Sequence, residues 1–338
     1  MKICAVTVTY GDRGHFLKQV IYALYESTVK VDRIVIVDNG SNISFEDILS
    51  MDVFNIDIVK SGKNIGSAAG FKLGLQKAAE SGCDLVWLLD DDNVPESCAL
   101  EKILEKRKIL GNNELHVFAA QRIDRAKYLS AATTNFTLEI KKNAFLGFTL
   151  TNLPRILWRR LSMNFKRESS LVKTNIVVLK KIFYGIYGGL LLHRIWLQKG
   201  LYPNENFYLY VDDTEYTTRL VQNGAEIYLV PESIIKDVDI SWAQKSSGNL
   251  HPMLDMDVDT RRLYYTIRNS CYLSKARFVD NRFIFYTNIV LFIPLMFIRG
   301  IIHGNSFISM LKRFNLVLHA VLDGVQSRLG YKEIIPGM

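Results

Sequence analysis

Strand-like and helix-like segments alternate over residues 3–89, and this alternation constrains the fold more than any other feature of the sequence. Apolar runs typical of strands lie at 3–9, 33–38, 56–60 and 85–89, and helical patterns lie between them at 15–26 and 70–81. Strands that are joined by helices usually pair in parallel. The pattern therefore predicts an α/β fold, with a mostly parallel sheet flanked by helices.

Polar residues follow the ends of several expected strands. Thr9 and Tyr10 end the first strand, Asp38 follows the second, and three aspartates follow the fourth. Ligands of open parallel sheets bind beyond the carboxyl ends of the strands. We therefore expect these polar side chains to meet at one edge of the sheet and to form a binding site there.

The three aspartates are Asp90, Asp91 and Asp92, directly after the apolar strand. Side chains alternate along a strand, so Asp90 and Asp92 are expected on one face and Asp91 on the other. Two like charges about 4 Å apart repel by roughly 4 kcal/mol at an effective dielectric near 20, and a divalent cation between them reverses that cost. Oxygen ligands favour Mg2+, Mn2+ or Ca2+ over zinc. The alternative is an acidic turn that caps a helix beginning near Pro95.

A second acidic group, Asp212, Asp213 and Glu215, follows the apolar run 207–211, which reads as regular structure, and opens a helix at 214–223. A carboxylate there acts as a general base only if it faces a substrate hydroxyl. The alternative is that Asp212 and Asp213 are helix N-caps with no catalytic role. A metal site and a separate base are the two parts that single-displacement group transfer requires.

A loop of small residues at 61–70 runs into a helix and contains Asn64 and Gly66. Backbone N–H groups in such a loop can approach a phosphate or a sugar closely, although a tight turn with close helix packing explains it equally well. The loop matches neither the GxxxxGK[ST] nor the GxGxxG pattern, which argues against a P-loop or a dinucleotide-binding oxidoreductase. The pair Gly188 and Gly189 has the same two interpretations.

Composition narrows the class of partner. The chain has 338 residues, 49% of them hydrophobic, and a net charge of +8 with pI ≈ 9.1. An anionic partner is expected, which is a nucleotide, a phospholipid surface or nucleic acid; without an aromatic and basic recognition motif, nucleic acid ranks last. The four cysteines form no CxxC pair, so we expect a reducing compartment and no disulfides. The first residues read directly as a strand and not as a secretory signal, which favours the cytosol.

Two segments suggest contact with a membrane. Residues 155–167 mix bulky apolar side chains with positive charge, as expected of a helix on anionic lipid or of a solvated basic face. Residues 283–298 are apolar between Arg282 and Arg299 and include Pro294. This stretch is shorter than the roughly 20 residues that span a bilayer, so interfacial anchoring or a buried core helix is expected. The expected domains are 1–255, with halves at about 1–125 and 126–255, and a helical region at 256–338.

In this order, the motifs resemble family 2 glycosyltransferases with the GT-A fold, and especially bacterial galactofuranosyl- and rhamnosyltransferases of cell-surface polysaccharide synthesis. The resemblance covers nearly the whole chain. It is carried by Val6-Thr7-Val8-Thr9-Tyr10, Val37-Asp38-Asn39-Gly40-Ser41, the segment from Gly62 to Phe71, Asp90-Asp91-Asp92, Gly188-Gly189, Asp212-Asp213-Thr214-Glu215-Tyr216 and the segment from Arg261 to Asn269.

The resemblance implies a metal-dependent, inverting transfer from a nucleotide sugar, with UDP-galactofuranose as the expected donor and dTDP-rhamnose next. The acceptor would be a growing polysaccharide or lipid-linked glycan at the cytoplasmic face of the inner membrane. Asp213 corresponds to the catalytic base, with Asp212 beside it, and Asp90 and Asp92 to the pair that binds Mn2+ or Mg2+ on the diphosphate. Implied donor-side residues are Thr9, Tyr10, Asp38, Asn64, Gly66, Asp91 and, less firmly, Arg268; implied acceptor-side residues are Gly188, Gly189 and Glu215.

One departure from the family pattern concerns the metal. Relatives often carry a histidine ligand after the strand that follows the base helix, and residues 230–237 contain none. Asp237 is the nearest candidate, and a carboxylate oxygen suits Mg2+ or Mn2+. His251 is a looser alternative, because a lone histidine is more often a core or surface residue. The competing function is a non-catalytic, basic protein that binds membrane surfaces and whose acidic groups are only helix caps.

Overall fold

The computed structural model describes residues 1–49, 55–134, 136–152, 179–239 and 251–334. The chain packs as two compact units. Unit 1 comprises Met1–Glu139, Asn175–Tyr208 and Asp212–Ser241, and unit 2 comprises Ile140–Thr174, Leu209–Val211 and Trp242–Met338. The division expected from the sequence, at residue 255, stays a prediction. The basic segment 155–167 lies outside the described residues.

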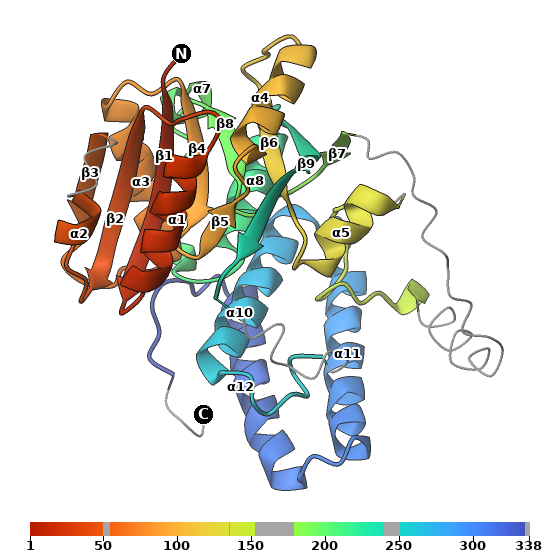
Figure 1. Cartoon of the computed structure of the whole chain (residues 1–338). Coiled ribbons are helices and arrows are strands. Elements are labelled where there is room, and N and C mark those ends of the chain that lie inside the picture. The colour runs from red at the N-terminus through yellow and green to blue at the C-terminus, as the bar shows by residue number, and fades with distance from the viewer. Residues whose placement is uncertain (50–54, 135, 153–178, 240–250, 335–338) are drawn as a thin grey trace, which may run out of the picture. The chain divides into compact units, whose positions relative to one another are not determined.

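Unit 1 is built on a mixed sheet with the strand order β3-β2-β1-β4-β8-β6-β9-β5, in which β7 also pairs with β9 (Figure 1). The pairs β1–β2, β1–β4, β2–β3 and β6–β9 are parallel, and β5, β7 and β8 run antiparallel to their neighbours. The described strands are β1 (Ile3–Gly11), β2 (Arg33–Ser41), β3 (Asn55–Lys60), β4 (Leu85–Asp90), β5 (Asn93–Pro95), β6 (His116–Arg122), β7 (Lys180–Ile182), β8 (Leu190–His193) and β9 (Glu226–Asp237).

Helices cover both faces of this sheet, as the alternation in the sequence predicted. The described helices of unit 1 are α1 (Gly14–Glu26), α2 (Glu46–Leu49), α3 (Ser67–Glu80), α4 (Ala99–Ile109), α5 (Ala126–Thr133), α7 (Ile195–Gln198) and α8 (Asp212–Gln222), with a 3-10 turn η3 (Glu205–Phe207). Alternate residues of β1 belong to two different apolar cores, Val6 and Val8 to the core under α3 and Ile3 and Ala5 to the core under α1 and α4.

Two glycines bring α3 close to the sheet. A Cβ on Gly70 would lie 2.7 Å from Val8 Cγ1, and a Cβ on Gly74 would lie 2.4 Å from Val6 Cγ1. Side chains at these positions would therefore force the helix away from β1. This close packing carries the loop before α3 to the edge of the sheet where β1 and β2 end.

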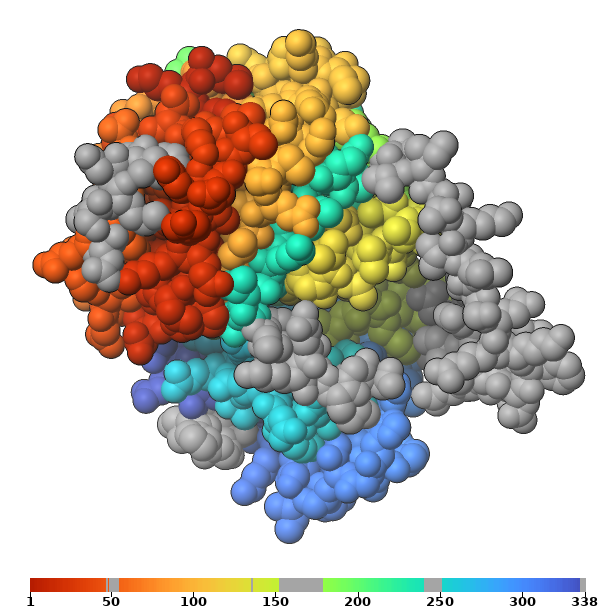
Figure 2. Space-filling view, viewed as in Figure 1, coloured from red at the N-terminus to blue at the C-terminus, as the bar shows by residue number. Residues whose placement is uncertain are grey.

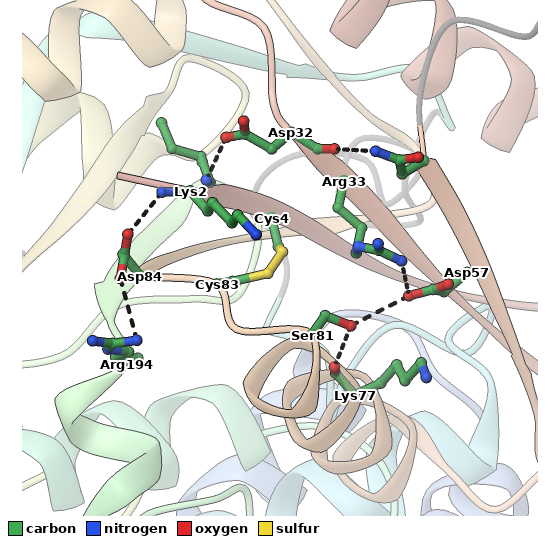
Figure 3. Close-up of a disulfide and its surroundings, with 12 residues drawn as sticks. Lys2, Cys4, Asp32, Arg33, Asp57, Lys77, Ser81, Cys83, Asp84 and Arg194 are labelled. Atoms are coloured by element: carbon green, nitrogen blue, oxygen red, sulfur yellow. Dashed lines mark hydrogen bonds and ion pairs between the residues drawn. A yellow bond between two sulfur atoms is a disulfide. The ribbon is translucent and has the colours of Figure 1, made fainter.

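The expectation that the chain contains no disulfide is wrong. Cys4 in β1 and Cys83, two residues before β4, form a disulfide across a sequence separation of 79 residues, with the Cα atoms 5.9 Å apart (Figure 3). Parallel pairing of β1 with β4 places the two cysteines together. Spacing along the sequence cannot reveal such a pair, because the register of two distant strands decides it. Cys98 and Cys271 are free.

Unit 2 is helical in its described part, as predicted for the C-terminal region. Its helices are α10 (Thr260–Arg277), α11 (Arg282–Ile302) and α12 (Phe307–Val325), with a short 3-10 turn η1 (Leu150–Asn152). The side chains of Asp259, Asn281 and Ser306 cap the three helices by accepting backbone N–H hydrogen bonds. Within the described residues, α11 is the one helix long and apolar enough to cross a membrane, and 39% of its apolar window is buried in the fold.

Candidate functional site

The expected acidic group forms where β4, β5 and β9 meet. Residues Asn93–Pro95 are not the start of a helix but the strand β5, which pairs with β9 so that Asn93 lies opposite Asp237. The amide nitrogen of Asn93 donates to Oδ1 of Asp92 at 2.9 Å and to Oδ1 of Asp237 at 2.7 Å. The sheet register therefore brings Asp237, named from the sequence as a candidate, next to the carboxylates that follow β4.

Arginines that sequence reasoning missed bind this acidic cluster. Arg13 donates from Nε to both carboxylate oxygens of Asp91, from Nη2 to Asp92 at 2.8 Å, and from Nη1 to Asp239 at 2.7 Å. Arg13 follows β1 at the same edge of the sheet. Its position just after a strand could therefore have identified it as a candidate site residue. Its guanidinium also lies over the ring of Tyr10.

Two further arginines reach the cluster from β6 and the segment after it. Arg122 is fully buried and bonds Asp237 and, at 3.2 Å, Oδ1 of Asn93; Arg125 pairs with the other oxygen of Asp237 at 3.3 Å. Nothing near Arg122 in the sequence marks it as part of the site. Its partners come from strands that are distant along the chain, so only the tertiary pairing reveals it.

Burial and the charges of neighbouring carboxylates raise the pKa values of Asp90 and Asp237. Burial, followed by the charges of Asp92 and Asp237, raises the pKa of Asp90 well above its ordinary value, although Arg122 opposes the change. Burial also raises the pKa of Asp237 to about 7. Burial and repulsion therefore disfavour the ionised carboxylates, and a bound cation would stabilise them in the folded protein.

The donor set suits a hard divalent cation. Within the described residues, the Asp90 carboxylate accepts no hydrogen bond. The negative charges of Asp92 and Asp237 act on it and raise its pKa. The same part of the chain contains no group of three or more His, Cys, Asp or Glu side chains already arranged to hold a metal ion. Arg13 and Arg122 bind the carboxylates instead. The chemistry of the donors therefore fits Mg2+ or Mn2+, with the arginines as competitors.

The second acidic group opens α8, as predicted. Burial raises the pKa of both aspartates; for Asp212, burial and the charge of Asp213 raise it to about 7. Oδ1 of Asp213 accepts from the backbone N–H of Thr214 at 2.5 Å and from its hydroxyl at 3.1 Å. A buried carboxylate with a raised pKa has the properties of a general base.

The segment before α8 differs from the regular structure expected at 207–211. Tyr208, Tyr210 and Val211 have φ values of 59°, 61° and 66°, in the left-handed region that is costly for side chains of this size. In unit 2, the buried amide of Asn269 donates to the carbonyls of Leu209 and Tyr210, both at 2.8 Å. Sequence reasoning assigned neither this turn nor the role of Asn269.

The same two arginines, Arg122 and Arg125, interact electrostatically with both acidic groups. Arg122 and Arg125 both lower the pKa of Asp213, while Asp90, Asp213 and Asp237 together raise the pKa of Arg125 against the effect of burial. All these residues belong to unit 1. The metal-site candidates and the base candidate therefore both lie within electrostatic reach of Arg122 and Arg125.

The loop before α3 is fastened to the end of β2 by Asn39, which sequence reasoning did not single out. Its Oδ1 accepts from the N–H of Ile65 at 2.8 Å, and its Nδ2 donates to the carbonyl of Gly66 at 3.1 Å. Oδ1 of Asn64 accepts from the N–H of Gly66 at 2.9 Å. Gly66 has φ 91°, and a Cβ there would lie 2.3 Å from the carbonyl oxygen of Tyr208. The loop conformation thus requires glycine at this position.

The remaining donor-side candidates of unit 1 differ in accessibility. Tyr10 is 43% exposed, and Asp38 uses Oδ1 to hold the N–H and hydroxyl of Ser41, which leaves Oδ2 without a partner in the described part of the chain. Thr9 is fully buried, and its place at the nucleotide stays a prediction. Asp91 is also buried and engaged with Arg13.

The acceptor-side candidates have structural partners. A Cβ on Gly188 would lie 2.0 Å from Oδ1 of Asn93, and a Cβ on Gly189 would lie 2.6 Å from Cβ of Ala120, so both glycines allow close packing beneath the acidic cluster. Glu215 is buried and pairs with Arg219 at 2.9 Å. These contacts give all three residues a structural role, and their place on the acceptor side stays a prediction.

Two weaker candidates lie in unit 2. Arg268 is buried, stacks on the ring of Tyr265 and donates to the carbonyl of Gly330 at 2.7 Å. This geometry explains Arg268 by helix packing and gives no support to a contact with phosphate. The Nδ1 of His251 accepts from the N–H of Met253 at 3.3 Å, and burial lowers its pKa to about 4. His251 is therefore a neutral imidazole, and its role as a ligand stays a prediction.

Comparisons with known proteins agree with this architecture. Residues 4–143 match the family described as Glycosyl transferase family 2. Galactofuranosyltransferase GlfT1 of Mycolicibacterium smegmatis is 24% identical over 285 residues, which cover 80% of this chain and 82% of that protein.

Two solved structures show the same fold. GalNAc-T7, crystallised with UDP, GalNAc and Mn2+, has a TM-score of 0.55 at 10% identity, and the match covers 81% of this chain but only 48% of that one. S. aureus TarS 1-349 has a TM-score of 0.51 at 11% identity, over 97% of this chain and 82% of that one. The expected GT-A-like fold is thus confirmed. Residues 4–143 match the model of family 2 glycosyltransferases, and the chain is a glycosyltransferase that resembles galactofuranosyltransferases.

Proposed function

We propose that this chain transfers a sugar from a nucleotide-activated donor to a hydroxyl of a cell-surface polysaccharide or lipid-linked glycan, with inversion at the anomeric carbon. The preferred donor is UDP-galactofuranose, supported by the similarity to GlfT1, and dTDP-rhamnose comes next. The observation that carries the proposal is that Arg122 and Arg125 pair with Asp237 of the first acidic group and also lower the pKa of Asp213 in the second. One bound sugar between a diphosphate site and a base requires such proximity.

Asp213 is the proposed base in a single displacement. Its carboxylate takes the proton from the acceptor hydroxyl while that oxygen forms a bond to the anomeric carbon from the side opposite the leaving group. The bond between the anomeric carbon and the diphosphate oxygen breaks in the same step, and the electron pair leaves with the nucleotide diphosphate. Asp212 lies beside the base and, when ionised, favours protonation of Asp213 through its negative charge.

Asp90, Asp92 and Asp237 are the residues that would hold Mn2+ or Mg2+. A divalent cation there would neutralise the charge that develops on the departing diphosphate. Arg122 and Arg125 supply positive charge at the same place from the protein itself. Tyr10, through its exposed ring, and Asp38, through its unpartnered Oδ2, are proposed to receive the base and ribose, and the loop of Asn64 and Gly66 lies at the donor side.

The proposed location is the cytoplasmic face of the inner membrane, where lipid-linked acceptors and nucleotide sugars meet. The net charge of +8 favours an anionic surface. Burial of both Cys4 and Cys83 limits the access of reductants to their disulfide in that compartment.

Paired variants test the assigned roles. Asp213→Asn is expected to bind UDP-galactofuranose with nearly unchanged affinity and to lose transfer by about 10²–10⁴-fold, the usual size of a general-base contribution. Asp92→Ala is expected to weaken donor binding in the presence of Mn2+ as well. Asp57→Asn, which removes a carboxylate paired with Arg33 away from the cluster, serves as the control and should retain full activity.

Transfer assays across nucleotide sugars decide the remaining alternatives. Turnover with dTDP-rhamnose but not with UDP-galactofuranose would change the sugar and leave the mechanism intact. Full activity of both Asp213→Asn and Asp92→Ala would refute the assigned roles. If no nucleotide sugar is bound or hydrolysed, with Mn2+ or with Mg2+, the enzyme proposal fails and a binding protein becomes the better explanation.

A further inference from the structure

The outer surfaces of α11 and α12 in unit 2 are apolar although they face away from their own core. In α11 the inner positions Phe285, Ile289, Phe292 and Met296 are buried, as expected for one face of a helix. The outer positions also carry large apolar side chains that are exposed: Phe283, Ile284, Tyr286, Val290, Leu295, Ile298, Ile301 and Ile302. A helix that is apolar on all sides is normally enclosed by protein or lipid.

A group of exposed apolar side chains flanks the turn that joins α11 to α12. We name these residues the apolar turn: Ile298, Ile301, Ile302, Phe307, Ile308 and Leu311. Ile302 is 77% exposed, Ile308 68% and Phe307 61%. The blue atoms in Figure 2 show that this helical region is at the surface. Contiguous exposed apolar surface of this kind marks an interaction site in a folded protein.

The charges around the apolar turn indicate which class of partner fits this surface. Residues 281–322 contain no aspartate or glutamate, whereas Arg282, Arg299 and Lys312 are cationic and at least partly exposed. Apolar side chains combined with this excess of cations are complementary to an anionic lipid surface, even though the exposed Asp257 lies near Arg313 of α12. In a symmetric dimer the same surface would meet itself and oppose cation with cation, which disfavours a second copy of this chain.

Contacts inside unit 2 argue that α11 lies against a membrane and does not span it. The fully buried amide of Asn288, in the second turn of the helix, accepts from the N–H of Leu150 and donates to the carbonyl of Asn143, both at 2.8 Å. Phe292 packs its ring against Phe145 and Phe148. Because one side of α11 is fastened to polar protein segments, lipid can cover only the other side.

From these observations we propose that the apolar turn inserts into the headgroup region of an anionic membrane, while Arg299 and Lys312 bind the lipid phosphates. The inference rests on the proposed location at a membrane surface, and it names the part of the chain that makes the contact. It holds for any sugar that the enzyme transfers. The occupant is lipid of net negative charge, and neutral lipid alone is not sufficient.

Flotation of the full chain with vesicles tests the proposal. The wild-type protein is expected to float with vesicles that contain phosphatidylglycerol and to remain unbound with pure phosphatidylcholine. Ile302→Asp combined with Phe307→Asp should lower the partition coefficient by about tenfold or more, since each removes a large apolar group from the lipid. Ile109→Asp in α4 of unit 1, where Ile109 is 73% exposed, is the matched control and should bind like the wild type.

Charge and folding need separate variants. Arg299→Gln with Lys312→Gln should weaken binding to anionic vesicles by about fivefold per residue and reduce its dependence on salt. Phe307→Trp keeps the turn apolar and adds a fifth tryptophan, so the difference between its emission and that of the wild type should shift to shorter wavelength on anionic vesicles and be quenched by brominated lipid. This readout remains valid even if the double aspartate variant fails to fold.

Three results would overturn the proposal: no binding of the wild type to anionic vesicles, unchanged binding of the double aspartate variant, or no spectral shift of the introduced indole in the Phe307→Trp variant. A dimer in sedimentation that the double aspartate variant converts to a monomer would assign the surface to a second copy instead. Hydrolysis of the nucleotide sugar by the double aspartate variant should be unchanged. Failure of membrane binding is therefore distinguishable from failure of the proposed enzyme activity.

Discussion

Arg13 and Asp91 form a two-point contact in which Nε of the arginine donates to both carboxylate oxygens at 3.0 Å. The same guanidinium also binds Asp92 and Asp239. Burial alone would lower the pKa of Arg13, but these carboxylates raise it, so the group stays charged. One internal cation thus holds three carboxylates, one of which is a proposed metal ligand.

Arg13→Met is expected to destabilise the protein and to make its stability depend on divalent cations. Breaking a largely buried ion pair leaves unpaired carboxylates and costs about 3–5 kcal/mol. Mn2+ or Mg2+ should restore part of the loss, because the cation takes over the charge that Arg13 supplied. Thermal unfolding with and without the cation measures both effects.

Arg33→Met is the control for this experiment. Arg33 pairs with Asp57 at 2.6 Å, but both side chains are partly exposed, so the loss should be at most about 1 kcal/mol and insensitive to cations. Equal responses of the two variants to Mn2+ would contradict the assignment of Arg13 as the cation's competitor.

Replacement of Arg125 by methionine is predicted to move the acidic limb of the pH profile to higher pH. The base must be ionised to accept a proton, so kcat/KM falls as the pH falls through the pKa of Asp213. Burial raises that pKa, and Arg125 and Arg122 lower it through their charges. Removing Arg125 therefore raises the pKa of Asp213, and activity should decline more at acidic than at alkaline pH.

Arg194→Met provides the comparison, because Arg194 is 44% exposed like Arg125 but pairs with Asp84 near the opposite ends of the strands. Its profile should coincide with that of the wild type. An acidic limb that stays in place, or moves to lower pH, in Arg125→Met would argue against Asp213 as the group that titrates.

Much of the fold could be predicted from local sequence patterns. The helices at 15–26 and 70–81 and the strands at 3–9 and 85–89 were found because each carries its own apolar periodicity. The strands β5 and β7 escaped notice because each has only three residues and exists only through pairing with β9. The turn at 208–211 escaped notice because its left-handed residues are held by tertiary contacts, not by glycine.

The candidate site shows the same difference between residues that a local sequence pattern marks and residues that only tertiary contacts reveal. The candidates Asp90, Asp92 and Asp213 could be named because runs of charge after apolar segments are unusual in a sequence. Arg122 was missed, and Asn39 was quoted in a motif without a role of its own, because each has its partners far along the chain, at Asp237 and at the loop before α3. A polar residue that acts through distant partners leaves no local pattern to recognise.

Asn39→Ala is expected to loosen the loop before α3 and to weaken donor binding. The mutation leaves the N–H of Ile65 and the carbonyl of Gly66 without partners, which should lower the free energy of unfolding by about 1–3 kcal/mol. KM for the nucleotide sugar should rise more than kcat falls, because Asn39 holds the loop that is proposed to lie at the donor side. Asn55→Ala, which removes a long, exposed hydrogen bond to Asp32, should change neither quantity. A loss of kcat at constant KM would place Asn39 nearer to the chemistry.

The Cys4–Cys83 disulfide gives a prediction that can be read without any substrate. Titration of thiols in unfolded, non-reduced protein should find two groups, from Cys98 and Cys271, and reduction should expose all four. A loop closed across 79 residues contributes about 4 kcal/mol by restricting the unfolded chain, so a reductant should lower the Tm of the wild type. Cys83→Ser should already have the lower Tm and show no further response, whereas Cys98→Ser should behave like the wild type. Four reactive thiols before reduction would mean that β1 and β4 pair without this bond, and the expectation of a thiol-only protein would then be correct.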